Sequence, residues 1–539
     1  MKKFPVYPIL LAVFPILSLW AANLLYVGVT ATYRSFLVIL LGTFLLWGIL
    51  AAVFRDVHKS ALITSLAGVL FFSYGRLYPV IEDVSLLGFN IGRHRYLVLA
   101  FGVILFLLAW RIVASKKDFS KINSLMLLVG VGLVALPVFQ ITSHYIRQAG
   151  FAASQNGDQL TTQRTQPDVV TLTPPADGVL PDIYYIILDS YGRADVLKDC
   201  FQYDIQPFLN GLESEGFVTA ERSQTNFTIT DLSLTASLNM DYPQALAVKP
   251  AQASDPAVLH EWAVHNTVRN SLEKIGYKTV AFDSGYGVSQ WEDADVYYVR
   301  SSGARWLLGG INPFEDMLLN TTLGTIVFQM DARLPTALRV FLDGAHLEHR
   351  QRMLDIMDNL VKVPDNPEPT FTFVHILAPH NPFVFGPDGE YVSRNTPFTL
   401  NNDQDIKDGF VYISGYTDQV IYLNKRFSEI IDEIIQKSDV PPVIILQGDH
   451  GPSRWVTSTT GRSFILNTYL FPGADKLVYP TISPVNSFRV VFNSLFNANL
   501  PLLPDQTFFT THSTIEQLQP VDGTEEKCNP AFLKPTKQQ

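Results

Sequence analysis

The chain has 539 residues, of which 47% are hydrophobic and only 17% are charged, so it is richer in apolar residues than an ordinary soluble protein. Its formal net charge is -10, and no cluster of Lys and Arg marks the polar part, which argues against a nucleic-acid partner. Only two cysteines occur, Cys200 and Cys528, which excludes a disulfide framework or a cysteine-rich zinc site. The sequence leaves open whether the two cysteines form one disulfide or remain separate thiols.

The apolar residues are concentrated in the first 145 positions. Five runs there approach the roughly 20 apolar residues that a helix needs to cross a bilayer. No Asp, Glu or Lys lies at the centre of any run, which favours an anchor over a transport pathway. A more specific alternative is that the helices give the rest of the chain access to lipid. A cleavable signal peptide is the alternative for the first run. The runs cover residues 5–28, 35–54, 60–77, 94–113 and 122–143, the third being the weakest.

The charges in the loops between these runs predict an orientation. Loops on one side hold eight Lys and Arg residues, and those on the other side hold five. Because the richer side is normally cytoplasmic, five crossings place the C-terminal domain outside the cytoplasm, in an integral plasma membrane protein. If the third run does not span, this prediction reverses.

The rest of the chain alternates between strand-like and helix-like patterns. Nearly continuous apolar runs at 182–188, 371–377 and 442–446 are typical of strands buried on both faces of a parallel sheet. Segments 263–275 and 416–437 show helical spacing. This alternation predicts an α/β domain with a mostly parallel sheet flanked by helices. The expected organisation is a transmembrane anchor (1–145), a linker (146–180), a catalytic domain (181–510) and a C-terminal tail (511–539).

Polar residues follow each of the three apolar runs. Asp189 follows the first, His380 the second, and Asp449 with His450 the third. Sites in open α/β sheets form at the carboxyl ends of strands, and oxygen and imidazole donors suit a divalent metal. Taken singly, Asp189 could cap the helix after it, and Asp449-His450 could be a simple turn.

A hydroxyl-rich segment, residues 226–239, supplies a candidate nucleophile. Thr230 would open a helix there, where the helix N-terminus stabilises anionic oxygen and a metal activates the hydroxyl. The alternative is an amphipathic helix whose leucines face the core.

Together these motifs resemble the alkaline phosphatase superfamily, in the sulfatase-like branch with lipoteichoic acid synthases and phosphoethanolamine transferases. That branch often has about five N-terminal membrane helices. The resemblance covers roughly residues 180–510. The matching motifs are Asp189, Thr230-Asp231-Leu232-Ser233, His380-Asn381-Pro382-Phe383 and Asp449-His450-Gly451.

The resemblance implies roles for these residues. It makes Thr230 the catalytic nucleophile, and it makes His380 a contact to the transferred group. Trp291, in a loop that binds substrate in the synthases, is a further candidate, although the arginine expected near it is replaced by acidic residues. His375 recurs in some members, but a strand histidine with a satisfied hydrogen bond is the preferred interpretation. The implied ligands of one or more divalent ions, Mn²⁺ or Zn²⁺, are Asp189, Thr230, Asp449 and His450.

The arylsulfatase motif Cys/Ser-x-Pro-x-Arg is absent from the sequence, so the resemblance describes the fold rather than sulfate chemistry. We therefore predict transfer or hydrolysis of a phosphoryl-linked group of a phospholipid or envelope glycopolymer through a phospho-threonine. A sulfuric ester hydrolase and a catalytically inactive envelope scaffold are the alternatives. Further candidates for binding phosphate are Arg193, Arg300, Arg305 and Arg454.

Overall fold

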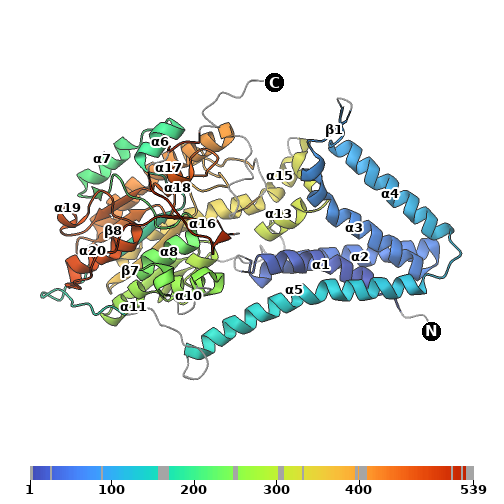
Figure 1. Ribbon diagram of the computed structural model, residues 1–539, viewed down its shortest axis with the longest axis horizontal. Coiled ribbons are helices and arrows are strands. Elements are labelled where there is room, and N and C mark those ends of the chain that lie inside the picture. Colours follow the sequence, from blue (N-terminus) through green and yellow to red (C-terminus); the bar gives the residue numbers. More distant parts are fainter. Residues whose placement is uncertain are drawn as a thin grey trace. The chain divides into compact units, whose positions relative to one another are not determined.

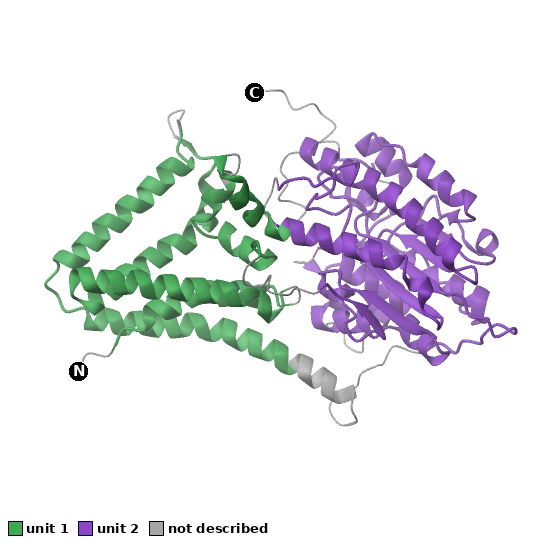
Figure 2. Ribbon diagram, turned by 180° about the vertical axis from the view of Figure 1, so that it is seen from behind, with its two compact units in different colours: residues 1–162, 302–345 green, residues 163–301, 346–539 purple. Residues whose placement is uncertain are grey.

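The chain forms two compact units in the computed structural model (Figure 2). The membrane-helix unit contains residues 1–162 and 302–345, and the sheet unit contains residues 163–301 and 346–539. The structure describes residues 4–24, 27–86, 89–155, 169–246, 253–300, 309–330, 333–394, 398–399, 409–511, 514–523 and 526–529.

All five apolar runs form helices in the membrane-helix unit. Among the described residues, four helices are long and apolar enough to cross a membrane, whereas α1 is a shorter apolar helix of 16 residues. The third run, the weakest by sequence, belongs to a helix of 25 residues. The bounds are α1 (Tyr7–Ala22), η1 (Val29–Thr32), α2 (Tyr33–Phe54), α3 (Val57–Ile81), β1 (Ser85–Leu86), β2 (Phe89–Asn90), α4 (His94–Ala114) and α5 (Ser120–Gln155).

A segment from the middle of the sequence packs on these helices. Phe314 and Leu318 lie in one buried apolar cluster with Ile16 of α1. The guanidinium of Arg34, in the first turn of α2, forms an ion pair with Glu315. Residues 302–345 therefore belong to the membrane-helix unit although they follow β6 in the chain. Their helices are α13 (Pro313–Asn320), α14 (Thr325–Gln329) and α15 (Thr336–Leu342).

The sheet unit is built on a seven-stranded sheet in the order β4-β9-β8-β3-β7-β5-β6. Only β9 runs opposite to the others, so the predicted mostly parallel sheet is confirmed. The central strand β3 has six fully buried residues, in agreement with its continuous apolar sequence. The strands are β3 (Ile183–Leu188), β4 (Val218–Thr219), β5 (Lys278–Phe282), β6 (Val296–Tyr298), β7 (Thr370–Ile376), β8 (Val443–Gln447) and β9 (Asn467–Leu470).

Helices cover both faces of this sheet. Figure 1 shows α6, α7 and α17 on one side and α8, α10, α11 and α20 on the other. The helix predicted at 416–437 lies within α17, and its apolar residues from Val420 to Ile434 are buried. The larger helices are α6 (Ala194–Phe201), α7 (Gln206–Ser214), α8 (Thr230–Asn239), α10 (Pro256–Val264), α11 (Thr267–Lys274), α16 (Gly344–Leu360), α17 (Gly409–Lys437) and α20 (Pro484–Phe496). The shorter elements are α9 (Pro243–Leu246), η3 (Gly287–Ser289), η5 (Val363–Asp365), α18 (Thr459–Ser463), α19 (Ala474–Leu477), β10 (Phe508–Phe509) and β11 (Gln519–Pro520).

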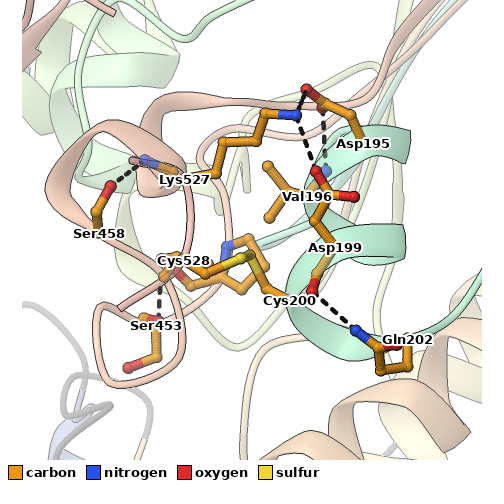
Figure 3. The surroundings of a disulfide bond; sticks show 12 residues. Asp195, Val196, Asp199, Cys200, Gln202, Ser453, Ser458, Lys527 and Cys528 are labelled. Carbon is orange, nitrogen blue, oxygen red and sulfur yellow. Dashed lines mark hydrogen bonds and ion pairs between the residues drawn. A yellow bond between two sulfur atoms is a disulfide. The ribbon is translucent and has the colours of Figure 1, made fainter. Parts of the chain in front are cut away.

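The two cysteines form a disulfide, which resolves the alternatives that the sequence leaves open. Cys200 lies on α6 and Cys528 near the C-terminus, with their Cα atoms 5.4 Å apart (Figure 3). The bond joins residues separated by 328 positions in the sequence.

Candidate active site and metal centre

Two neighbouring parallel strands deliver three of the predicted residues to one edge of the sheet. Asp189 directly follows β3, and Asp449 and His450 follow β8, which pairs with β3 along its whole length. Gly448 permits the close approach of the two strand ends, because a Cβ atom there would lie 2.4 Å from the carbonyl oxygen of Tyr191. The tight packing after β8 therefore requires glycine at this position.

The three side chains converge and are buried. Oδ1 of Asp189 lies 3.8 Å from Nε2 of His450, and Oδ2 of Asp449 lies 3.6 Å from the same nitrogen. Their exposed fractions are 4%, 0% and 3% for Asp189, Asp449 and His450. Two carboxylates held this close in a buried setting repel each other unless positive charge lies between or beside them.

Hydrogen bonds set the orientation of Asp449 and His450. Nδ1 of His450 lies 3.0 Å from the carbonyl oxygen of Gly451, to which it donates. The other ring nitrogen, Nε2, then presents its lone pair to the carboxylates. The backbone N–H of Ser190 donates to Oδ1 of Asp449 at 3.0 Å, so Oδ2 is the oxygen that faces the cluster.

This donor set fits a divalent metal ion. One ligand atom from each of Asp189, Asp449 and His450 can be chosen so that all lie within 4.8 Å of one another. Metal–ligand bonds of about 2.0–2.2 Å place neighbouring ligand atoms about 3.3–3.6 Å apart, close to the separations seen here. Oδ1 of Asp189 is buried and has no hydrogen-bond partner, as expected of an atom that binds a cation.

The surroundings of Asp189 keep it ionised. Burial by itself would raise the pKa of this carboxyl, but the imidazoles of His380 and His375 beside it act in the opposite direction. His450 acts in the same direction as these two, and the net effect holds the pKa of Asp189 below its usual value. The carboxylate is therefore available as a ligand throughout the physiological pH range.

Thr230 is the first residue of α8 and points into the same cluster. Its Oγ1 donates a 2.7 Å hydrogen bond to Oδ2 of Asp449 and lies 3.4 Å from Nε2 of His450. The preceding Ile229 makes no side-chain cap, so no side chain from this position occupies the N–H groups of the first turn. A helix end of this kind stabilises an anion beside Thr230.

The neighbouring hydroxyls have other partners. Oγ1 of Thr228 hydrogen-bonds to the carbonyl oxygen of Thr510 at 3.3 Å, outside the cluster. Oγ of Ser233 donates to the backbone oxygen of Asp449 at 2.7 Å, which helps to hold that turn in place. Among the candidates in this segment, Thr230 is the hydroxyl that the structure brings to the carboxylates.

Two histidines from β7 and the turn after it lie beside the cluster. The rings of His380 and His450 are 6.3 Å apart, and Nδ1 of His380 donates to the carbonyl oxygen of Asn381. Nε2 of His375 lies 3.5 Å from Oδ2 of Asp189, and its Nδ1 is 2.8 Å from Oγ of Ser289. His375 therefore has through Nδ1 the satisfied hydrogen bond expected of a strand histidine, while its buried Nε2 approaches Asp189 without a hydrogen-bond partner among the described residues.

Trp291 lies in the core of the sheet unit. Its side chain is 0% exposed, and its ring stacks on Phe373 of β7 with centroids 4.4 Å apart. The guanidinium of Arg269 lies 5.5 Å from the indole centroid. The structure thus packs Trp291 against the sheet rather than bringing it to the carboxylates, and its contact with substrate stays a prediction.

The arginines proposed from the sequence lie at other places. Arg193 pairs with Asp195 at 2.7 Å, Arg300 pairs with Asp355 at 3.2 Å, and Arg454 stacks over Phe509. Arg305 lies outside the described residues.

Two residues near the cluster belong to none of the sequence motifs. Nη2 of Arg462 lies 3.4 Å from Nε2 of His450, although no motif marks that position. His349 of α16 is 1% exposed, and burial, together with Arg352 and His346, lowers its pKa to about 3, so it is neutral. Helical spacing identifies the face of α16 on which His349 lies, but the sequence does not show what that face contacts.

Comparison with known proteins assigns the chain to a family. The family model for the sulfatase domain matches residues 181–469, more than half of the chain. The chain therefore belongs to the sulfatase family, within the alkaline phosphatase superfamily, as its motifs predict. No curated protein sequence matches it significantly.

Several solved structures resemble the chain at low identity. The periplasmic domain of EptC from Escherichia coli is 13% identical over 66% of this chain and 97% of that domain, with a TM-score of 0.41. The lipooligosaccharide phosphoethanolamine transferase EptA from Neisseria meningitidis is 14% identical over 91% of this chain and 95% of its own, with a TM-score of 0.38. The lipoteichoic acid synthase LtaP from Listeria monocytogenes is 13% identical over 62% and 80%, with a TM-score of 0.36.

Proposed function

We propose that the protein is a membrane-anchored, metal-dependent phosphotransferase or phosphodiesterase that acts on a phospholipid or envelope glycopolymer. The observation that supports this best is the placement of Thr230 Oγ1 at 2.7 Å from Asp449 Oδ2, within a buried cluster of metal-type donors and at a helix N-terminus. A hydroxyl in this setting is a nucleophile for phosphoryl transfer.

Each residue of the site has a proposed role. Asp189, Asp449, His450 and Thr230 would hold the ion, with Mn²⁺ or Zn²⁺ proposed from the family resemblance. When bound, a divalent ion supplies positive charge that favours the ionised hydroxyl and neutralises phosphoryl oxygens. His380, whose ring lies 6.3 Å from that of His450, is the proposed contact to the transferred group. We keep Trp291 as a proposed substrate contact from the resemblance alone.

The chemistry takes two displacements at phosphorus. In the first, Thr230 Oγ1 gives up its proton and forms a bond to phosphorus while the bond from phosphorus to the leaving alcohol breaks, and that alcohol takes up a proton. In the second, the oxygen of water or of an acceptor hydroxyl loses its proton and forms a bond to phosphorus while the bond from phosphorus to Oγ1 breaks, and Oγ1 takes up a proton. The two outcomes, hydrolysis and transfer, differ only in this acceptor.

The proposed location is the outer face of the plasma membrane. The charge asymmetry of the loops supports an extracytoplasmic sheet unit. The disulfide between Cys200 and Cys528 supports it independently, because such bonds persist in oxidising compartments. The domain boundaries inferred from the sequence remain part of this proposal, with the catalytic domain at 181–510 interrupted by residues 302–345, which belong to the membrane-helix unit.

Head-group release from lipid vesicles tests the function. The full-length protein, loaded with Mn²⁺ or Zn²⁺, is incubated with vesicles of phosphatidylethanolamine, phosphatidylglycerol or a sulfated lipid. We expect metal-dependent release or transfer from a phospholipid. Release from the sulfated lipid alone would favour a sulfuric ester hydrolase, and no turnover together with no bound metal would favour an inactive scaffold.

A further inference from the structure

A short C-terminal segment, residues 526–529, is fastened to the sheet unit and is named here the C-terminal strap. Its Cys528 is bonded to Cys200 of α6 (Figure 3). The same residue forms an antiparallel bridge with Thr457. The backbone N–H of Asn529 donates to the carbonyl oxygen of Val456 at 2.9 Å. The strap therefore pairs with the loop that follows His450 through an isolated β-bridge.

Lys527 provides further contacts of the strap. Its ammonium lies 2.8 Å from a carboxylate oxygen of Asp195 and 3.0 Å from one of Asp199 (Figure 3). Its carbonyl oxygen accepts a 2.8 Å hydrogen bond from the N–H of Ser458. The loop of residues 451–463, which includes α18, is thus held against α6 through the strap. The Lys527 side chain contacts α6, and the Lys527 backbone contacts the loop.

Arg462 lies at the far end of the same loop. Its carbonyl oxygen accepts a 2.7 Å hydrogen bond from the N–H of Gly451, which closes the loop next to His450. Its Nε donates to the carbonyl oxygen of Thr228 at 3.2 Å, and its Nη2 lies 3.4 Å from Nε2 of His450. The guanidinium is therefore fixed between the segment before Thr230 and the imidazole of the metal-type cluster. The side chain is partly exposed, so a substrate can reach it.

The contact between Arg462 and His450 has a consequence once a cation is bound. Nε2 of His450 has one lone pair, and ligation of a metal uses it. An oxyanion would take the place of Nε2 as acceptor of the Nη2 N–H group, whereas Nε keeps its bond to Thr228 and Nη1 lies 3.5 Å from the carbonyl oxygen of Pro452. Hydrogen bonds between a guanidinium and an anionic oxygen are strong because both partners are charged.

We propose that Arg462 binds the oxyanion of the substrate beside the metal, as a further catalytic residue, and that the C-terminal strap positions it there. The inference rests on the proposed function and adds to it a defined arginine contact and a structural element that maintains it. A non-bridging oxygen of a phosphodiester or of a sulfate ester can accept from Nη2, so the shared chemistry is a tetrahedral oxyanion.

Oxyanion binding by the full-length, Mn²⁺-loaded protein tests the arginine, with inorganic phosphate and inorganic sulfate as separate probes in calorimetric titrations. Arg462→Gln is expected to weaken binding of the preferred probe about 10- to 100-fold, since charge-assisted contacts have this strength. The matched control is Arg222→Gln, which removes an exposed arginine of the same unit and should stay within about twofold of wild type. Wild-type affinity in Arg462→Gln, with Mn²⁺ affinity unchanged, would overturn the proposal.

A double-mutant cycle tests the strap. Replacing both Cys200 and Cys528 by serine is expected to weaken phosphate binding about tenfold in the wild-type background, because small displacements of a positioned group have this effect. In the Arg462→Gln background the same change should have no further effect. An equal loss in both backgrounds would show that the strap acts elsewhere and would contradict the proposal.

A second variant keeps the cycle informative if the serine variant does not fold. A Cβ atom at Gly461 would lie 2.0 Å from the carbonyl oxygen of Lys527, so Gly461→Ala separates the strap from the loop without removing the disulfide. It should reproduce the loss of phosphate affinity, and an unchanged affinity would count against the strap. If Arg462→Gln binds phosphate normally while turnover still depends on Thr230, only this inference fails and the proposed function stands.

Discussion

The hydroxyl of Thr230 donates a 2.7 Å hydrogen bond to Oδ2 of Asp449, a carboxylate that is completely buried and lies 219 positions later in the sequence. This bond connects the first residue of α8 to the turn after β8. It places the candidate nucleophile and a candidate metal ligand in one cluster.

Metal content should depend on the two buried carboxylates. Asp189→Asn and Asp449→Asn each replace an anionic ligand by a neutral amide, so affinity for Mn²⁺ or Zn²⁺ should fall by at least about 100-fold. Elemental analysis after dialysis of the full-length protein measures this. The exposed Asp177 offers a matched control, because Asp177→Asn removes one charge from the same unit away from the cluster. Equal metal content in all three variants would place the metal elsewhere.

His265 should make stability depend on pH. Hydrogen bonds to Asp293 and Glu261 raise its pKa from 6.5 to about 9. Because its pKa is higher in the folded protein than in the unfolded chain, protonated His265 stabilises the fold. This contribution is complete below about pH 6.5 and is lost as the pH rises through about 9. Since the ring is 31% exposed, we expect only about 1 kcal/mol, less than the full shift implies.

The measurement for His265 is thermal unfolding of wild type and His265→Gln near pH 6 and near pH 10. The difference in melting temperature between the two proteins should be clear at the lower pH and should shrink at the higher one. An equal difference at both pH values would mean that the ion pairs of His265 do not contribute as described.

The disulfide should stabilise the sheet unit. It closes a loop of 328 residues, and bonds of this kind typically contribute about 2–4 kcal/mol, largely by restricting the unfolded chain. Serine at both Cys200 and Cys528 should therefore lower the unfolding temperature of the unit by several degrees. Reduction of the wild-type protein should reproduce that shift, and reductant should have no effect on the serine variant.

The sequence predicts the fold class and the cluster because both depend on local patterns. Continuous apolar runs identify β3, β7 and β8, and parallel strands bring their carboxyl ends to the same edge, so Asp189, Asp449 and His450 can be expected to meet. The choice of Thr230 over Thr228 needed the family resemblance, because the spacing of hydroxyls alone does not fix the start of α8.

Other features depend on contacts between distant residues and have no local signal. Trp291 follows a strand end, as substrate-binding residues do, yet its ring stacks on Phe373, which lies 82 positions later in the sequence. Arg34 and Glu315 pair across 281 positions and draw residues 302–345 into the membrane-helix unit. Arg462 reaches His450 only through the fold of the intervening loop.

The most direct test of the account is detection of the covalent intermediate on Thr230. The full-length, metal-loaded protein is mixed with phospholipid vesicles, quenched in acid and digested, and the peptide that contains residues 226–239 is analysed by mass spectrometry. We predict a phosphoryl-linked adduct on Thr230 that is absent from Thr230→Ala, whose turnover should fall by at least about 10³-fold. Thr228→Ala, which removes a hydroxyl bonded to Thr510 instead, should retain the adduct. Wild-type turnover in Thr230→Ala, or an adduct on another residue, would contradict the account.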